Sequence, residues 1–226
     1  MKKITFVALS ATVGLGLMSF IPPASPATNT FEGVITYSVS VDNPQLAPAV
    51  ANSSVTAYIK GGKTKTYFNM GVSKSTFYTN SATPDANVVL IQAMGNNYQL
   101  KNDDSKKSDD MNPDIKYMDG TKTIAGHTCH KAQMTMKGGD GKPYTTDVYY
   151  TEDIPATPDV HSPFNQLKGF PLEYTKRQQG MNLLITATNI EKKNIPDDTF
   201  TIPTGYKLMT AREITQDVHK QMADTQ

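Results

Sequence analysis

Residues 31–41, FEGVITYSVSV, decide the fold. Apolar or small side chains stand at every second position, and the positions between them are mostly polar. Because the side chains of a strand alternate between the two faces of a sheet, this stretch predicts a strand with one buried and one wet face. Strands of that kind are typical of antiparallel sheets. The first set is Phe31, Gly33, Ile35, Tyr37, Val39 and Val41, and the second includes Glu32, Thr36, Ser38 and Ser40.

The same alternation continues along most of the chain. Gly61 and Gly62 separate two alternating runs, which predicts a hairpin with a tight turn. A second hairpin is predicted around the glycine-rich residues 138–141, and a further turn at residues 95–97. Residues 183–185 are apolar on both faces, so their strand is expected in the middle of the sheet. The expected strands are 31–41, 55–59, 65–70, 73–79, 87–94, 98–101, 121–124, 128–137, 144–151, 170–174, 182–190 and 200–203.

Two segments interrupt the pattern. Residues 101–114 are polar and carry charges of both signs, which predicts a solvated loop. Between residues 152 and 166, Pro155, Pro158 and Pro163 exclude a long strand or helix. We therefore expect an irregular crossing over the sheet, with one short helical turn near residues 164–167.

The C-terminal residues 210–223 change period. Ala211, Ile214, Val218 and Met222 are spaced by three, four and four, which is one apolar stripe of a helix. Thr210 and Glu213 have the spacing of a capping box at its start. The segment predicts an amphipathic helix that docks on the sheet, either as a lid over a cavity or as ordinary core.

Residues 1–27 have the features of a secretory signal peptide. Lys2 and Lys3 precede an apolar run, and small side chains follow it, so we expect cleavage between Ala27 and Thr28. The sole cysteine, Cys129, is far from that point, which argues against a lipid anchor. We find no second apolar run, so the mature chain is expected to have no integral membrane segment. The remaining residues 28–226 form one domain: sheet and crossing segment at 28–209, and the helix after them.

Charge and cysteine content exclude several classes of protein. The chain has a formal net charge of +1, and loss of Lys2 and Lys3 would leave 20 basic and 21 acidic side chains. Neither a nucleic-acid partner nor an anionic membrane surface is implied. One cysteine allows no internal disulfide, so apolar burial must hold the fold. The expected location is the periplasm or the outside of the cell.

His127, Cys129 and His130 fall within four residues and have the chemistry of a copper or zinc site. Strand geometry separates them, because His127 and Cys129 point one way and His130 the other. The aspartates of residues 101–114 lack the glycine and the terminal glutamate of a calcium loop. A catalytic thiol needs a base and a site that stabilises the thiolate, such as a helix N-terminus, whereas Cys129 lies inside a predicted strand. The chain also has no GxSxG, HExxH or CxxC motif and no glycine-rich phosphate loop. We therefore expect no cofactor and no enzyme activity, with a metal-binding protein as the least favoured alternative.

Five segments of the chain follow one another in an order seen in known proteins: residues 31–37 (FEGVITY), 123–132 (TIAGHTCHKA), 148–154 (VYYTEDI), 168–174 (KGFPLEY) and 198–206 (DTFTIPTGY). In this order they resemble secreted bacterial proteins of a family named Domain of Unknown Function 4412. The same layout resembles the GLPGLI proteins, in which a Gly-Leu-Pro-Gly-Leu run stands where this chain has Lys168-Gly169-Phe170-Pro171-Leu172. The resemblance covers most of the chain after residue 27.

These families are similar to the periplasmic lipoprotein carriers LolA and LolB. The resemblance implies a β-dominated α+β fold. In this fold, one curved antiparallel sheet forms a half-open barrel, wraps a helix and encloses an apolar cavity. The leading expectation is a protein that binds or carries a lipid or acyl chain in the concave face of the sheet. The alternative is a structural or stress-related interaction module with a filled core. The residues expected at the cavity or its lid are Ile214, Val218, Met222, Tyr150 and Tyr174.

Overall fold

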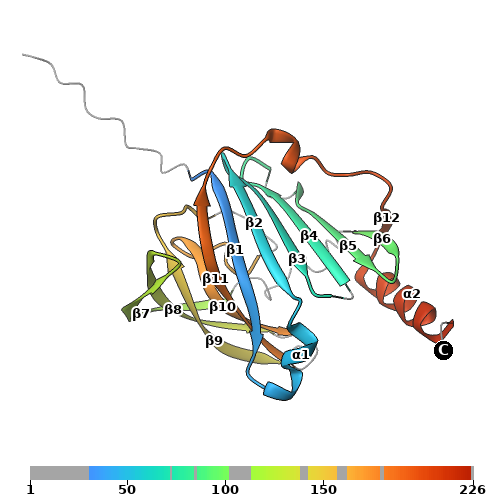
Figure 1. The fold of residues 1–226 in the computed structure, drawn as a ribbon, viewed down its shortest axis with the longest axis horizontal. Coiled ribbons are helices and arrows are strands. Elements are labelled where there is room, and N and C mark those ends of the chain that lie inside the picture. The colour runs from blue at the N-terminus through green and yellow to red at the C-terminus, as the bar shows by residue number, and fades with distance from the viewer. Residues whose placement is uncertain are drawn as a thin grey trace, which may run out of the picture.

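The computed structural model describes residues 31–71, 73–83, 86–101, 113–137, 142–156, 162–178 and 181–224. Within these residues twelve strands form one sheet, in the order β12-β6-β5-β4-β3-β2-β1-β11-β10-β9-β8-β7. The sheet is strongly curved, and it is antiparallel except where β12 pairs with β6 (Figure 1). The expected β-dominated fold, one curved antiparallel sheet with a C-terminal helix, is confirmed.

Most elements are joined by short connections, and the longest link is the crossing segment 152–169 between β9 and β10. The helical segments are η1 (Pro44–Leu46), α1 (Ala47–Val50), η5 (Asp197–Phe200) and α2 (Ala211–Asp224). The strands are β1 (Gly33–Val41), β2 (Ser54–Lys60), β3 (Lys63–Asn69), β4 (Ser73–Asn80), β5 (Val88–Ala93), β6 (Asn96–Leu100), β7 (Asp114–Ile124), β8 (His127–Lys137), β9 (Pro143–Thr151), β10 (Phe170–Gln178), β11 (Met181–Lys192) and β12 (Lys207–Met209).

Both predicted hairpins are present. Gly61 and Gly62 join β2 to β3 with φ of 55° and 78°, a conformation that favours glycine at both turn positions. Strands β8 and β9 pair from His130 to Lys137, although their turn lies outside the described residues. The β5–β6 turn falls on Met94 and Gly95, one residue earlier than predicted. Strand β7 begins at Asp114, seven residues before its prediction, and most of the predicted loop 101–114 lies outside the described residues.

The register defines two faces of the sheet. Residues directly opposite one another in an antiparallel pair point to the same side. One row carries mostly apolar side chains and marks the core face: Ala187, Tyr37, Val55, Phe68, Ser75, Ile91 and Tyr98. The next row carries only polar side chains and marks the polar face: Glu173, Thr186, Ser38, Ser54, Asn69, Lys74, Gln92 and Asn97.

The crossing segment between β9 and β10 packs into the core. Ile154 and Leu167 are fully or almost fully buried, together with Ile35 and Tyr37 of β1. The Leu167 N–H donates to the Phe164 carbonyl over 3.1 Å, so the expected short turn exists as a hydrogen-bonded turn. Gly169 approaches the backbone of Thr151 so closely that an added side chain would overlap it.

Strand β11 is central, as predicted, because β1 and β10 flank it. Leu183 and Ile185 are buried on the core face. The prediction that this strand is buried on both faces is wrong at Leu184. Its side chain points to the polar face and is 39% exposed. No element covers it there closely enough to remove it from water.

The predicted strand at residues 200–203 is wrong. The 3-10 helix η5 ends at Phe200, and residues 201–203 pair with no strand of the described chain. Pro203 has no backbone N–H to donate to a neighbour. The edge of β6 is instead occupied by β12, through Lys207 opposite Tyr98.

The C-terminal helix α2 begins and ends one residue later than predicted. Its capping box is present: the Thr210 N–H donates to Glu213 Oε2 over 2.7 Å, and the Glu213 N–H donates to Thr210 Oγ1 over 3.3 Å. The sheet does not wrap around this helix. The crossing segment occupies the curve, whereas α2 lies at the β6 edge of the sheet (Figure 1). No helix in the described residues is long and apolar enough to cross a membrane.

Candidate functional site

The structure keeps His127, Cys129 and His130 apart. His127 Nδ1 lies 2.8 Å from Asp153 Oδ2, which ties the start of β8 to the crossing segment. His130 is exposed and its ring faces Tyr150, with ring centres 5.9 Å apart. Within the described ranges, no three His, Cys, Asp or Glu side chains gather as metal ligands. The cluster therefore does not form a metal site by itself.

Cys129 is placed for packing. It is completely buried, and its Sγ donates to the His127 carbonyl over 3.6 Å. Burial raises the pKa of the thiol to about 11, because the charged thiolate would lose its hydration. A thiol that stays protonated is a poor nucleophile and a poor metal ligand.

Tyr150 and Tyr174, expected at a ligand cavity, are part of the core cluster. They are 4% and 8% exposed. The Tyr174 ring centre is 4.7 Å from that of Phe164 and 6.5 Å from that of Tyr37. Burial raises the pKa of the Tyr174 hydroxyl. Around these two tyrosines the core face is filled by side chains.

The helix residues expected at a lid lie elsewhere, on the core face beside β6. Tyr98 of β6 donates from its hydroxyl to Asp217 over 2.7 Å and accepts from Gln221 over 3.1 Å. Burial falls along the predicted stripe: Ile214 is buried, Val218 is half-buried and Met222 is 43% exposed. The predicted cleavage site at Ala27 and Thr28 lies outside the described residues.

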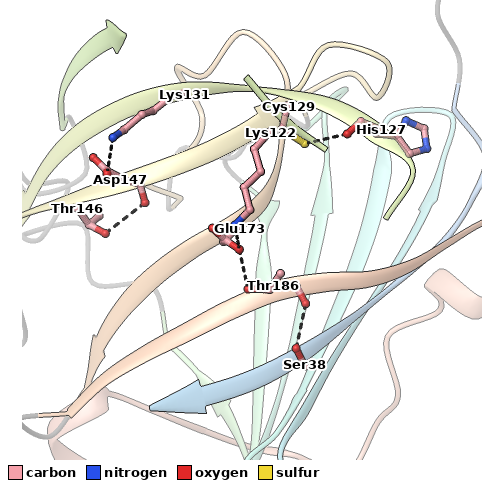
Figure 2. Close-up of polar contacts among 9 residues, drawn as sticks. All are labelled: Ser38, Lys122, His127, Cys129, Lys131, Thr146, Asp147, Glu173 and Thr186. Carbon is pink, nitrogen blue, oxygen red and sulfur yellow. Dashed lines mark hydrogen bonds and ion pairs between the residues drawn. The ribbon is translucent and has the colours of Figure 1, made fainter. Parts of the chain in front are cut away.

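A groove of ≈ 840 Å³ opens on the polar face, across strands β1, β11, β10, β9 and β8. Figure 2 looks into this region, where β8 and β9 bend over β10, β11 and β1. Its walls combine hydroxyl, amide and charged side chains with apolar surface from Val41, Tyr144, Tyr149 and Leu184. The polar lining residues include Asp42, Asp147, Glu173, Thr175, Arg177 and Asn182.

Glu173 is the centre of a chain of polar contacts at one end of the groove. Its side chain is only 12% exposed, and both carboxylate oxygens accept from Lys122 Nζ, at 2.8 and 2.9 Å. Thr186 Oγ1 also donates to Glu173, over 3.0 Å, and Ser38 donates to the Thr186 carbonyl over 3.4 Å (Figure 2). Lys122 Nζ lies 5.2 Å above the centre of the Tyr149 ring. The carboxylate is therefore compensated and held in place.

A second ion pair stands on the facing wall. Lys131 Nζ lies 2.7 Å from Asp147 Oδ2, and the hydrogen bond raises the pKa of Lys131 (Figure 2). Strand pairing sets the spacing, because Lys131 is opposite Tyr149 and Tyr149 is opposite Glu173. Three neighbouring strands thus contribute one side chain each to the same face.

Sequence reasoning did not single out the groove residues. Each occupies the polar position of an alternating strand, which by itself indicates only a solvated face. Lys122 and Glu173 are 51 residues apart in the sequence, and their contact depends on strand order and on the bend of the sheet. The one usable signal was that Arg177, Thr175 and Glu173 share one face of a single strand.

Comparison with known proteins gives a likeness of fold. No family model matches this chain, and no curated protein matches it by sequence. The chain is similar to PNGF-II, with 15% identity and a TM-score of 0.55 over 84% of this chain, and it spans only 33% of that one. It is also similar to MucB (11% identity, 80% of this chain, 60% of that one, TM-score 0.34) and to LprF from Mycobacterium bovis (11%, 77%, 90%, 0.30).

Proposed function

We propose that this protein is an exported, non-enzymatic binding module that holds a polar ligand in the groove on the polar face of its sheet. The observation that carries the proposal is the groove itself, whose volume of ≈ 840 Å³ is within the range of about 300–1,000 Å³ typical of ligand sites. Glu173, tied to Lys122 and Thr186, supplies a positioned polar group inside it. The buried, protonated Cys129 supports a binder rather than a thiol enzyme.

The filling of the core supports a polar over an apolar ligand. Tyr150 and Tyr174 occupy positions at which an acyl chain was expected. In the groove, by contrast, polar surface exceeds apolar surface. A ligand that hydrogen-bonds to the lining would replace the water lost there, whereas an acyl chain would leave buried polar groups without partners.

Native mass spectrometry of the protein recovered from the periplasm tests the proposal, because a retained ligand adds its mass. We expect an adduct on the wild type and its loss in Thr175→Trp, in which the larger side chain occupies the groove. Lys74→Trp is the matched control, because Lys74 is exposed on the same face outside the groove. An adduct that survives in Thr175→Trp would overturn the groove as the binding site.

A second candidate function is the apolar carrier, favoured by a different part of the core face. Phe68, Phe77 and Ile91 are half-buried there, in strands between the filled core and the edge that carries α2. Lys176 Nζ lies 5.1 Å from the Phe68 ring centre, and burial lowers the pKa of Lys176. An ammonium beside apolar rings would suit the carboxylate of a fatty acid.

The double variant Ile214→Asp, Val218→Asp tests the carrier. If α2 covers a ligand, the variant should lose uptake of a fluorescent fatty-acid analogue while its melting temperature falls only modestly. Lys176→Met should weaken the same uptake. A wild type that never takes up the analogue, or a double variant that unfolds, would remove this candidate.

A further inference from the structure

The charges of the polar groove are already engaged within the protein. Glu173 is paired with Lys122 and Asp147 with Lys131, at 2.8 and 2.7 Å. Asp42 accepts a hydrogen bond from Asn182 over 3.2 Å. Arg177 also interacts with another residue of the chain. A strongly anionic or cationic ligand would have to compete with these contacts and would lie beside charges of its own sign.

The same groups keep unused hydrogen-bonding capacity. A carboxylate offers about four lone-pair sites and an ammonium three N–H donors, more than the contacts at Asp147 and Lys131 use. Thr175 adds a hydroxyl and Asn182 an amide to the lining. A ligand hydroxyl both donates and accepts, so it can bind to a carboxylate and an ammonium without separating the ion pair.

Two of the groove's apolar surfaces stand among these polar groups. Tyr149 is half-buried and lines the groove with its ring, and Leu184 is 39% exposed there. A tyrosine ring offers an apolar body with a polar tip. A sugar ring has the complementary layout, with C–H groups on its faces and hydroxyls around its rim.

Strand topology disfavours an extended peptide. The strands that line the groove, β1, β8, β9, β10 and β11, each have a neighbour on both sides in the sheet. Their backbone groups are used in those pairings, so a peptide could not add to an edge in the way that gives β-augmentation its affinity. Recognition in this groove must use side chains alone.

We propose that the polar groove binds a neutral, hydroxyl-rich ligand, a short saccharide, with Asp147 and Glu173 accepting from its hydroxyls and Tyr149 against a sugar face. This inference rests on the proposed function and specifies its ligand. Asp147 and Glu173 accept from these hydroxyls while they stay bound to Lys131 and Lys122. The chemistry selects uncharged sugars over sulfated or sialylated ones.

A printed glycan array carrying neutral, sulfated and sialylated oligosaccharides tests the inference with the labelled full chain. We expect retention by neutral glycans, and calorimetry with the strongest of them should give a Kd at least tenfold weaker in Asp147→Ala and in Tyr149→Ala. Lys74→Ala should leave the Kd unchanged. If the melting curve of Asp147→Ala or Tyr149→Ala shows that the variant fails to fold, Thr175→Trp replaces it. Thr175→Trp fills the groove without removing either ion pair.

Each of the other outcomes overturns a stated part of the inference or of the proposed function. Retention of charged glycans alone, lost in the groove variants, would overturn the ligand class and leave the groove as a binding site. Neutral-glycan binding that none of the groove variants weakens would overturn both the inference and the proposed function. If no glycan is retained, the saccharide inference fails, and the mass adduct in Thr175→Trp decides the groove separately.

Discussion

Lys122 Nζ lies 2.8 Å from Glu173 Oε1 and joins β7, at one edge of the sheet, to β10, three places further in. Strands β8 and β9 stand between them in the sheet order, so the contact requires the sheet to bend over its polar face (Figure 2). The bend creates the groove. The ion pair holds the β7–β8 arm in that position.

Lys122→Met should therefore lower the stability of the protein. Glu173 is 12% exposed, so removal of Lys122 leaves a largely buried carboxylate with Thr186 as its remaining donor. We expect the free energy of unfolding in urea to fall by about 1 kcal/mol, at the upper end of the ~0–1 kcal/mol of exposed pairs and below the ~3–5 kcal/mol of fully buried ones. Lys193→Met is the control, because Lys193 and Glu191 are both about half exposed. Equal losses in the two variants would contradict a special role for the Lys122 pair.

Cys129 should react with a disulfide reagent only when the protein unfolds. Its pKa of about 11 leaves roughly one thiol in a thousand ionised at pH 8, and burial blocks access to it. Because the chain has one cysteine, the released chromophore reports this site alone. Rapid stoichiometric labelling in native buffer would show that the site is open. Cys129→Ser should fold, with a loss of about 1 to 3 kcal/mol for the buried hydroxyl.

The His127–Asp153 contact predicts a pH dependence. The hydrogen bond from His127 is the main cause that lowers the pKa of the Asp153 carboxyl. A carboxyl whose pKa is lower in the folded state stabilises the fold above its unfolded pKa of about 4, and this stability is lost as the pH falls through the folded pKa. The wild type should thus be more stable than Asp153→Asn at pH 6, by well under 1 kcal/mol because the carboxyl is 63% exposed.

Urea titrations at pH 6 and pH 3 check this difference. The two proteins should converge at pH 3, where the wild-type carboxyl approaches protonation. Asp119 is exposed on strand β7, so Asp119→Asn should have the same free energy of unfolding as the wild type at both pH values. If the free energies of unfolding of wild type and Asp153→Asn differ as much at pH 3 as at pH 6, the charge of the pair contributes nothing to stability.

Alternation in the sequence was sufficient to predict most strands and the face of each residue. Residues 31–41, the Gly61-Gly62 hairpin and the capping box of α2 all depend on neighbours in the chain, so local rules describe them. The pairing of β12 with β6 brings together residues about a hundred positions apart, and no local pattern predicts it. The expected strand 200–203 has the right composition for a strand but no free partner edge.

The groove could not be predicted for the same reason. Leu184 is apolar, and its neighbours on both sides are buried, so the sequence predicts burial. Leu184 lies opposite Thr175 and Ser40 on the polar face, where it lines the groove. Further along the groove, the register of β9 and β10 shifts between Pro171 and Glu173. A bulge of that kind changes the direction of a strand without a large change in its alternation.

Tyr98 offers the most direct test of how α2 is held. Its side chain is completely buried, and its hydroxyl donates to Asp217 over 2.7 Å and accepts from Gln221 over 3.1 Å. Few apolar contacts support the helix, since Ile214 is its only buried residue. A 14-residue helix is marginal in water by itself. Tyr98→Phe keeps the ring and removes only the hydroxyl, so α2 should lose two of its polar contacts with β6, while the 2.7 Å hydrogen bond from Asn96 Nδ2 to Gln221 Oε1 stays.

We expect Tyr98→Phe to raise amide hydrogen exchange in residues 211–224 at least tenfold, while strands β8 to β11 exchange as in the wild type. The free energy of local opening of the helix should fall by about 1 to 3 kcal/mol, because Asp217 and Gln221 lose the Tyr98 hydroxyl as a partner. The core should keep its stability, because within the described part of the chain this hydroxyl bonds only to side chains of the helix. Tyr206→Phe is the matched control, since its hydroxyl accepts one exposed hydrogen bond, from Gln92 over 3.4 Å. If exchange in α2 is unchanged, Ile214, the capping box and the Asn96–Gln221 hydrogen bond hold the helix, and the Tyr98 hydroxyl does not.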